Sequence, residues 1–455
     1  MMGAALAAAV VELDWLAVNV ALPQIAVDLN EPQTDLHWVV TAFAVGFGGI
    51  LPVAGWAIDA LGRRRMMLYA IGIFLSGSLV CAFALGAPWL IAGRALQGVA
   101  AAVATPCALA LMSDNLRGEQ RDKAVVKVFA ATGLGIALGP VLGGLFVDTI
   151  GWRSVFFIGW PAALAAAWLL GRHATNSTRV GSVARPPLTG MLCVTAGVVL
   201  LTITIDRGSE WGWSSPATLV CAMTALGLLG WFAVLERDER RSVLSRRILR
   251  ERGLILLTAA GTAAVVGFIL LNTLAAMYLR NSLDLAGLMT GCVLLAFSLP
   301  YALASYLAGR LGSGREVYRP VTFALISAAI GLAGLTLSPF PSLYLVSLAV
   351  CGISLGSTAA LLALLVQRRV GPEESGKVTS TNMAVKYFVA AIASTVSAVV
   401  LEGYHGAARG AESDVGGIDL LLRGTACAVT VGALLLIPEA LRANRASHDR
   451  DALPK

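Results

Sequence analysis

The sequence predicts an all-α integral membrane protein with fourteen spanning helices. Of its 455 residues, 57% are hydrophobic and only 13% are charged, and the mean hydropathy is +0.77. A soluble domain is about half apolar and about a quarter charged, so this balance indicates a chain whose solvent is a lipid bilayer. The apolar residues also gather into long runs, separated by short polar segments.

Each of these runs is long enough to cross a membrane, because a spanning helix needs about 20 mostly apolar residues. We interpret the first run as a span and not as a secretion signal, because it lacks a basic start and contains Glu12 and Asp14. The predicted spans cover residues 3–23, 38–58, 66–86, 88–113, 124–147, 152–171, 188–206, 216–235, 254–279, 285–308, 319–338, 341–366, 378–401 and 419–441.

The 34 lysine and arginine residues orient these spans. With the N-terminus inside, nearly all of them fall in inner segments, apart from Arg94 and Lys386 within spans. The outer segments hold only Arg153, Arg207, Arg280, Arg409 and Arg423. This bias predicts that both chain ends are cytoplasmic. It also accounts for the net charge of +7 without a nucleic-acid partner, since the basic residues are not interleaved with aromatic ones.

The longest basic segment, residues 236–252, follows the eighth span and divides the chain. Its position predicts a division into a first six-helix bundle, two extra helices with their flanking cytoplasmic loops, a second six-helix bundle and a cytoplasmic tail. The predicted boundaries are 1–171, 172–252, 253–441 and 442–455. Gly309, Arg310, Gly312 and Arg315 form a worn copy of a stretch after the second span, and such related halves are common in transporters.

Several spans carry charged residues. An acid at the centre of a membrane helix costs about 2.5–3.5 kcal/mol on insertion scales, so we expect Glu12, Asp14 and Arg94 to face a cavity or a partner. Glu12 and Asp14 are about 200° apart around one helix, so they cannot share a face, whereas Glu12 and Asn19 do. A carboxylate that gains and loses a cationic partner can take up and release a proton. The alternative for each charged residue is a purely structural role, in which it pairs with a neighbouring helix and does not change partners.

Two glycine-rich stretches, and the polar residues within three of the spans, resemble known motifs. Residues after span two resemble the signature loop of the major facilitator superfamily; these are Gly55, Asp59, Gly62, Arg63 and Arg64. Residues of span five resemble the antiporter motif of drug exporters; these are Gly135, Gly139, Pro140, Gly143 and Gly144. Arg94 and Gln97 of span four fall where the same superfamily has a motif. Asp14 and Asn19 of span one resemble the span-one motif of the fourteen-helix drug:proton antiporters of the EmrB/QacA type, and Asn382 and Lys386 of span thirteen lie where that branch has Asn and Arg.

This resemblance implies the major facilitator fold, with two six-helix bundles and two extra central helices. It favours Asp14 for proton coupling or cation binding, with Arg94 as its partner, and it implies that Asp59 latches to span eleven in the outward-facing state. Either Asp14 or Glu12 could carry the proton. Lys386 could balance the charge of the cavity or extend toward the membrane interface. The glycines of span five lie four apart and allow close helix contact, for gating or for packing alone.

The expected function is proton-coupled export of amphipathic, cationic or aromatic drugs across the cytoplasmic membrane of a bacterium. The expected partners are a small-molecule substrate, protons and the bilayer, and the expected state is a monomer. The alternatives are a dedicated exporter of one metabolite, antibiotic or lipid, and a membrane sensor that does not transport. We expect no enzyme, no cofactor beyond the proton gradient and no metal, because the seven cysteines lie in apolar runs without CxxC spacing and the four histidines are scattered.

Overall fold

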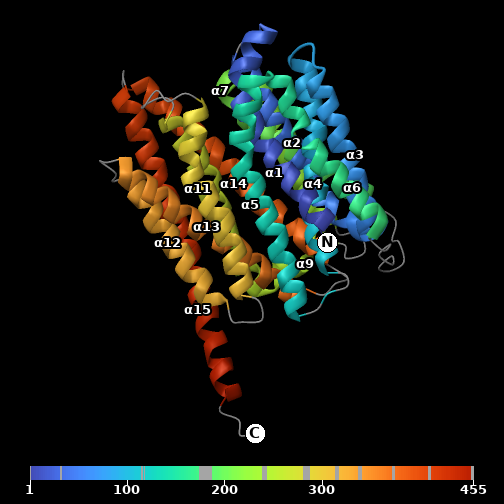
Figure 1. Ribbon diagram of the computed structural model, residues 1–455, viewed down its shortest axis with the longest axis vertical. Coiled ribbons are helices and arrows are strands. Elements are labelled where there is room, and N and C mark those ends of the chain that lie inside the picture. Colours follow the sequence, from blue (N-terminus) through green and yellow to red (C-terminus); the bar gives the residue numbers. More distant parts are fainter. Residues whose placement is uncertain are drawn as a thin grey trace. The chain divides into compact units, whose positions relative to one another are not determined.

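The computed structural model is built from helices (Figure 1). Its described residues are 2–30, 33–113, 116, 118–173, 187–237, 243–279, 287–312, 317–336, 341–370, 375–407 and 411–451. Thirteen helical segments among the described residues are long and apolar enough to cross a membrane. The one predicted span that is not among these thirteen, the span over residues 378–401, lies within α14 (Ser375–Ala407). The prediction of an all-α, many-span membrane protein is therefore confirmed.

The helices follow the predicted spans closely in order and position. Their bounds are α1 Met2–Leu29, α2 Gln33–Leu61, α3 Arg63–Ala82, α4 Ala87–Ser113, α5 Gly118–Thr149, η1 Trp152–Phe157, α6 Trp160–His173, α7 Leu188–Trp211, α8 Pro216–Leu235, α9 Arg246–Arg250, α10 Arg252–Met277, α11 Gly287–Gly312, α12 Tyr318–Thr336, α13 Pro341–Arg369, α14 Ser375–Ala407 and α15 Ala411–Asp451.

The structure differs from the prediction in three places: the start of the sixth span, an additional short helix and the end of the last helix. The sixth span begins with the 3-10 helix η1, since Gly151 adopts a φ of 106° and α6 starts only at Trp160. The short helix α9 was not predicted. The last helix continues into the predicted tail: its 41 residues measure about 60 Å, twice the thickness of the hydrocarbon core. Roughly half of α15 must therefore lie outside a bilayer.

The chain divides into two compact units. Unit 1 comprises Met1–Leu116, Leu134–Arg246 and Val370–Ala384, and unit 2 comprises Arg117–Gly133, Arg247–Arg369 and Val385–Lys455. Helix α5 therefore gives its first turns to unit 2 and the rest to unit 1, and α14 is divided the other way round.

In unit 1, α2 and α4 pack with their backbones in close contact. A Cβ on Gly98 of α4 would overlap the carbonyl oxygen of Phe43 and lie 2.9 Å from the backbone nitrogen of Phe47. A Cβ on Gly46 of α2 would likewise overlap the carbonyl oxygen of Ala95. Small residues allow such approach where apolar burial does not drive association. This contact fixes the part of α4 that carries Arg94 and Gln97.

Unit 2 uses the same arrangement for α11 and α13, which lie side by side (Figure 1). A Cβ on Gly352 would overlap the carbonyl oxygen of Phe297, and one on Gly356 would overlap that of Tyr301. Ser305 also donates to the carbonyl oxygen of Gly356 at 2.9 Å. Both units thus contain a pair of helices joined through glycines.

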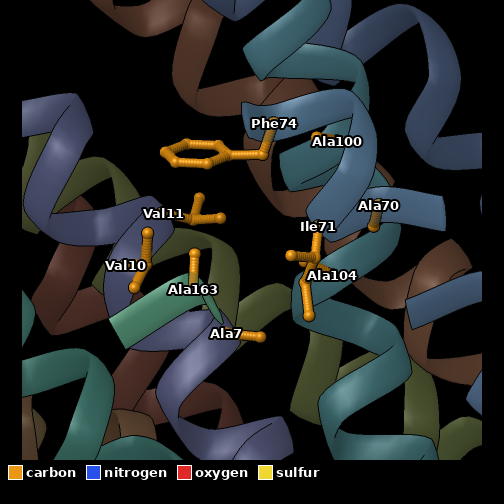
Figure 2. A pocket seen from close by; sticks show the side chains of 9 residues that line it. All are labelled: Ala7, Val10, Val11, Ala70, Ile71, Phe74, Ala100, Ala104 and Ala163. Atoms are coloured by element: carbon orange, nitrogen blue, oxygen red, sulfur yellow. The ribbon is translucent and has the colours of Figure 1, made fainter. Parts of the chain in front are cut away.

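A small apolar hollow lies among α1, α3, α4 and α6 of unit 1 (Figure 2). The nine side chains around it are Ala7, Val10, Val11, Ala70, Ile71, Phe74, Ala100, Ala104 and Ala163. A ligand site combines an apolar lining with a few polar groups that orient the ligand, and no lining side chain here is polar. We interpret the hollow as a gap in the packing of small residues.

Candidate functional site

Helices α1, α3 and α4 bring four polar side chains together in the interior of unit 1. Arg94 donates through Nη1 to Oδ2 of Asp14 at 2.6 Å and to Oε1 of Gln97 at 2.9 Å. Gln97 donates through Nε2 to Oδ1 of Asp14 at 2.9 Å and to Oγ of Ser78 at 3.0 Å. Arg94 and Gln97 are fully buried and Asp14 is only 3% exposed. The cluster is a closed hydrogen-bonded ion pair.

Helix α2 completes the surroundings of Arg94. The guanidinium donates through Nε to the carbonyl oxygen of Val39 at 3.3 Å, and it lies over the ring of Phe43 at 4.6 Å from the centroid. Its Nη2 atom is buried and has no hydrogen-bond partner among the residues that the structure describes. A buried charge needs partners to offset its lost hydration. Arg94 therefore retains one unused donor beside its carboxylate.

Glu12 lies outside this cluster, although it is only two residues from Asp14. It is half-buried and, within the part of the chain that the structure describes, it makes no hydrogen bond or ion pair. Asn19, seven residues further along the same face of α1, is exposed. The structure thus separates the two acids: Asp14 is paired and enclosed, whereas Glu12 lies on the face of α1 that carries Asn19.

The glycines of the antiporter-like stretch pack α5 onto the backbone of α1. A Cβ on Gly139 would lie 2.8 Å from the carbonyl oxygen of Leu13, and one on Gly143 would lie 2.7 Å from that of Ala17. A Cβ on Gly135 would overlap the carbonyl oxygen of Ala9. Gly144 is buried, and Pro140 lies inside α5, where it removes a backbone donor. This contact fixes the helix that carries Asp14.

The loop after α2 ties together several helix ends of unit 1. Asp59 accepts through Oδ2 from the backbone N–H of Lys377, in the first turn of α14, at 2.9 Å. Its Oδ1 lies 3.6 Å from Nη2 of Arg63. A carboxylate at a helix N-terminus binds N–H groups that the helix leaves unpaired, and it interacts favourably with the helix dipole.

Arg63 and Arg64 contact the opposite kind of helix end. Arg63 donates to the carbonyl oxygen of Ala110 near the end of α4 at 2.8 Å. Arg64 donates to the carbonyl oxygens of Leu170 and Gly171 at the end of α6, at 3.0 and 2.6 Å. Cations at helix C-termini are stabilising. Gly62, with a φ of 93°, allows the chain to turn directly into α3.

The latch differs from the expectation in one respect. The resemblance implied contact with span eleven, which is residues 319–338 in the predicted order. Asp59 instead meets α14, which contains the thirteenth predicted span. The two extra helices between the predicted bundles raise the number of each later span by two, so the partner is the thirteenth span of this chain and not the eleventh. Gly55 is buried one turn before Asp59.

Unit 2 holds a second buried ion pair, which the sequence did not indicate. Arg368 at the end of α13 donates through Nε and Nη2 to Oδ2 of Asp122 in α5, at 3.1 and 2.6 Å. The same Nη2 donates to the carbonyl oxygen of Gly312 at 2.6 Å. Asp122 is 4% exposed. The partners are 246 residues apart, and Gly312 belongs to the worn copy of the signature loop.

The two polar residues predicted in span thirteen fall in different units. Asn382 is buried in unit 1. Lys386 is half-buried in unit 2, where its side chain lies against Gly261 of α10. Sequence reasoning missed Ser78, Phe43 and Gly261 as neighbours of the predicted charges, because each comes from a helix whose apolar pattern does not reveal which residue faces a charge.

The described residues contain no cluster of histidine, cysteine or acidic side chains that could hold a metal ion. All seven cysteines are free thiols, and four of them are buried.

Comparisons with a family model and with known proteins both indicate the same family of transporters. A family model described as the Major Facilitator Superfamily matches residues 4–394. The chain is 30% identical over 395 residues to the multidrug resistance protein Stp of Mycobacterium tuberculosis, covering 86% of this chain and 72% of that protein. It is 33% identical over 449 residues to the puromycin resistance protein pur8 of Streptomyces alboniger, covering 94% and 87%.

The fold is similar to solved transporter structures. The structure of the human organic anion transporter MFSD10 matches 96% of this chain and 97% of its own with a TM-score of 0.67 at 14% identity. That of the proton:xylose symporter XylE matches 95% and 94%, also with a TM-score of 0.67, at 13% identity.

Proposed function

The chain belongs to the major facilitator superfamily, and we propose that it exports amphipathic, cationic or aromatic drugs in exchange for protons. Its relatives in this family are named as drug-resistance and multidrug transport proteins. The observation that carries the proton coupling is the enclosed ion pair between Asp14 and Arg94. The family and these relatives are transporters rather than enzymes.

The proton step follows from the hydrogen bonds of the pair. A proton that reaches Oδ2 of Asp14 neutralises the carboxylate and weakens its bond to Nη1 of Arg94. The guanidinium stays charged, so it must find another acceptor, and its unpaired Nη2 is already available to one. Loss of the proton on the cytoplasmic side restores the pair. Because α1 and α4 carry the two partners, the proton changes what holds these helices together.

Glu12 is the alternative proton carrier. It can take up a proton or contact a cationic substrate without breaking an existing pair in the described structure. Asn19 on the same face, and Gln97 beside Asp14, supply neutral hydrogen-bonding groups. In this arrangement Asp14 switches the helices, and Glu12 acts on the substrate side.

The conformational part of the cycle rests on the loop after α2. We expect Asp59 of α2, through its hydrogen bond to the first turn of α14, to hold one end state of an alternating-access cycle, while Gly62 permits the turn into α3. Arg63 and Arg64 anchor the loop to helix ends of its own unit.

The membrane setting is inferred from the sequence and the relatives. The positive-inside bias supports cytoplasmic chain ends, and the bacterial relatives support the cytoplasmic membrane of a bacterium. The division into bundles 1–171 and 253–441 with an insert at 172–252, and a monomeric state, belong to the same proposal.

The test is efflux of ethidium from cells that lack their own pumps and express this chain. We expect energy-dependent efflux that an uncoupler abolishes. Asp14→Asn should eliminate the uncoupler-sensitive part, whereas Glu12→Gln should change which dyes are exported. Efflux that is unchanged and still uncoupler-sensitive in Asp14→Asn would disprove the coupling role of Asp14.

A dedicated exporter is the second candidate, favoured by the name of the pur8 relative, which refers to puromycin resistance. Susceptibility profiling distinguishes the two functions. Protection against one compound among many structurally different drugs supports the dedicated exporter, and protection against several supports multidrug efflux.

A further inference from the structure

The ammonium group of Lys386 lies within the membrane part of unit 2. Lys386 is about 16 Å along α14 from Ser375, well inside the span of about 30 Å that a bilayer core requires. It is half-buried and, among the described residues, it forms no hydrogen bond or ion pair. A charge at this depth is costly without a counter-charge, so something other than the described chain is expected to provide one.

A notch in α10 accommodates the lysine side chain. A Cβ on Gly261 would overlap Cε of Lys386 and lie 2.7 Å from its Nζ. Any larger residue at position 261 would displace the ammonium. The glycine thus lets the long side chain lie directly against α10.

Three aromatic rings lie further along α10, one from α10 itself and two from α11. Phe268 lies seven residues after Gly261, which is two helical turns or about 10 Å along the axis. Its ring lies 5.8 Å from that of Phe297 and 5.3 Å from that of Tyr301, both from α11. Phe297 is fully buried, whereas Phe268 and Tyr301 are partly exposed.

This face therefore presents a cation and, about 10 Å away, partly exposed aromatic rings. Aromatic rings bind planar molecules by stacking or edge contacts, and a lone ammonium binds an anionic group. We propose that the α10 face of unit 2 binds aromatic substrates that carry an anionic group, with the anion on Lys386 and the ring on Phe268 and Tyr301. This inference rests on the proposed export function and specifies one class of substrate, aromatic compounds that carry an anionic group.

The experiment measures binding of two aromatic dyes to the purified full chain in detergent by fluorescence anisotropy. Fluorescein is anionic and ethidium is cationic. Lys386→Met should weaken fluorescein binding at least tenfold and leave ethidium binding unchanged or tighter, while Lys386→Arg should stay within about threefold of the wild type. Gly261→Ala should also weaken fluorescein binding, because it displaces the ammonium. Lys123→Met, at an exposed lysine of α5, is the matched control.

Wild-type protein that binds fluorescein no better than Lys386→Met would overturn the inference, as would an equal loss of ethidium binding, which would indicate a structural role for the lysine. Ethidium efflux from cells tests the proposed function separately. Efflux without fluorescein binding leaves export standing and removes only this inference. Lys386-dependent fluorescein binding without efflux of either dye removes export and leaves the site.

Discussion

Breaking the ion pair between Asp14 and Arg94 should be among the most destabilising single changes in unit 1. Both side chains are almost completely buried, and they share Gln97 as a common hydrogen-bond partner. Removing one member of a buried pair leaves an uncompensated charge and typically costs about 3–5 kcal/mol. We therefore expect Arg94→Gln to lower the free energy of unfolding by that amount.

Reversible unfolding in mixed detergent micelles, followed by helical ellipticity, measures this change. Asp14→Asn/Arg94→Gln should be more stable than the sum of the single variants predicts, by more than about 1 kcal/mol, because the double variant leaves no lone charge. Glu119→Gln is the control: it breaks a pair with Lys123 whose side chains are more than half exposed, which is worth about 0.3–0.5 kcal/mol. A loss below 1 kcal/mol in Arg94→Gln, or strict additivity, would refute the reasoning.

Three further predictions concern the helix contacts. Asp59→Asn should reduce dye efflux several-fold at normal membrane yield, because it weakens a charged hydrogen bond worth about 1.5–3 kcal/mol; Arg65→Gln, exposed in the same loop, should retain full efflux. Gly139→Ala should cost about 1–3 kcal/mol in detergent unfolding, because its Cβ meets the backbone of α1, whereas Gly227→Ala, with open space around it, should not destabilise. Arg368→Lys should lower the melting temperature nearly as much as Arg368→Gln, because an ammonium cannot replace donors at two nitrogen atoms; equal stability of Arg368→Lys and the wild type would contradict this.

The membrane class and the order of spans follow from sequence because the bilayer imposes a minimum length on every apolar run. Helix ends are less predictable, since a helix can continue into water on its own hydrogen bonds. Helix α1 runs to Leu29, beyond the predicted end at residue 23, and α15 runs to Asp451. Hydropathy records where a helix meets lipid and not where it stops.

The site was partly predictable for a related reason. A charge in an apolar run is visible, so Asp14 and Arg94 could be identified, and the family resemblance supplied their pairing. The partners of a charge depend on which helices become neighbours. Ser78 and Gly261 are ordinary small residues in apolar segments, and only the packing of α3 and α10 reveals what they contact. The pair of Asp122 and Arg368 spans 246 residues, and each partner reads as part of a solvated loop in the sequence.

The division of α5 and α14 between the two units has a mechanical consequence. Each unit contains the starting turns of a helix that continues in the other unit. Each starting segment is bound by an aspartate contact inside its own unit: Asp59 accepts from the backbone of Lys377 in α14, and Asp122 in α5 pairs with Arg368. We therefore expect a variant of either aspartate to loosen the start of one helix and to leave the hydrogen bonds of the Asp14–Arg94 cluster intact.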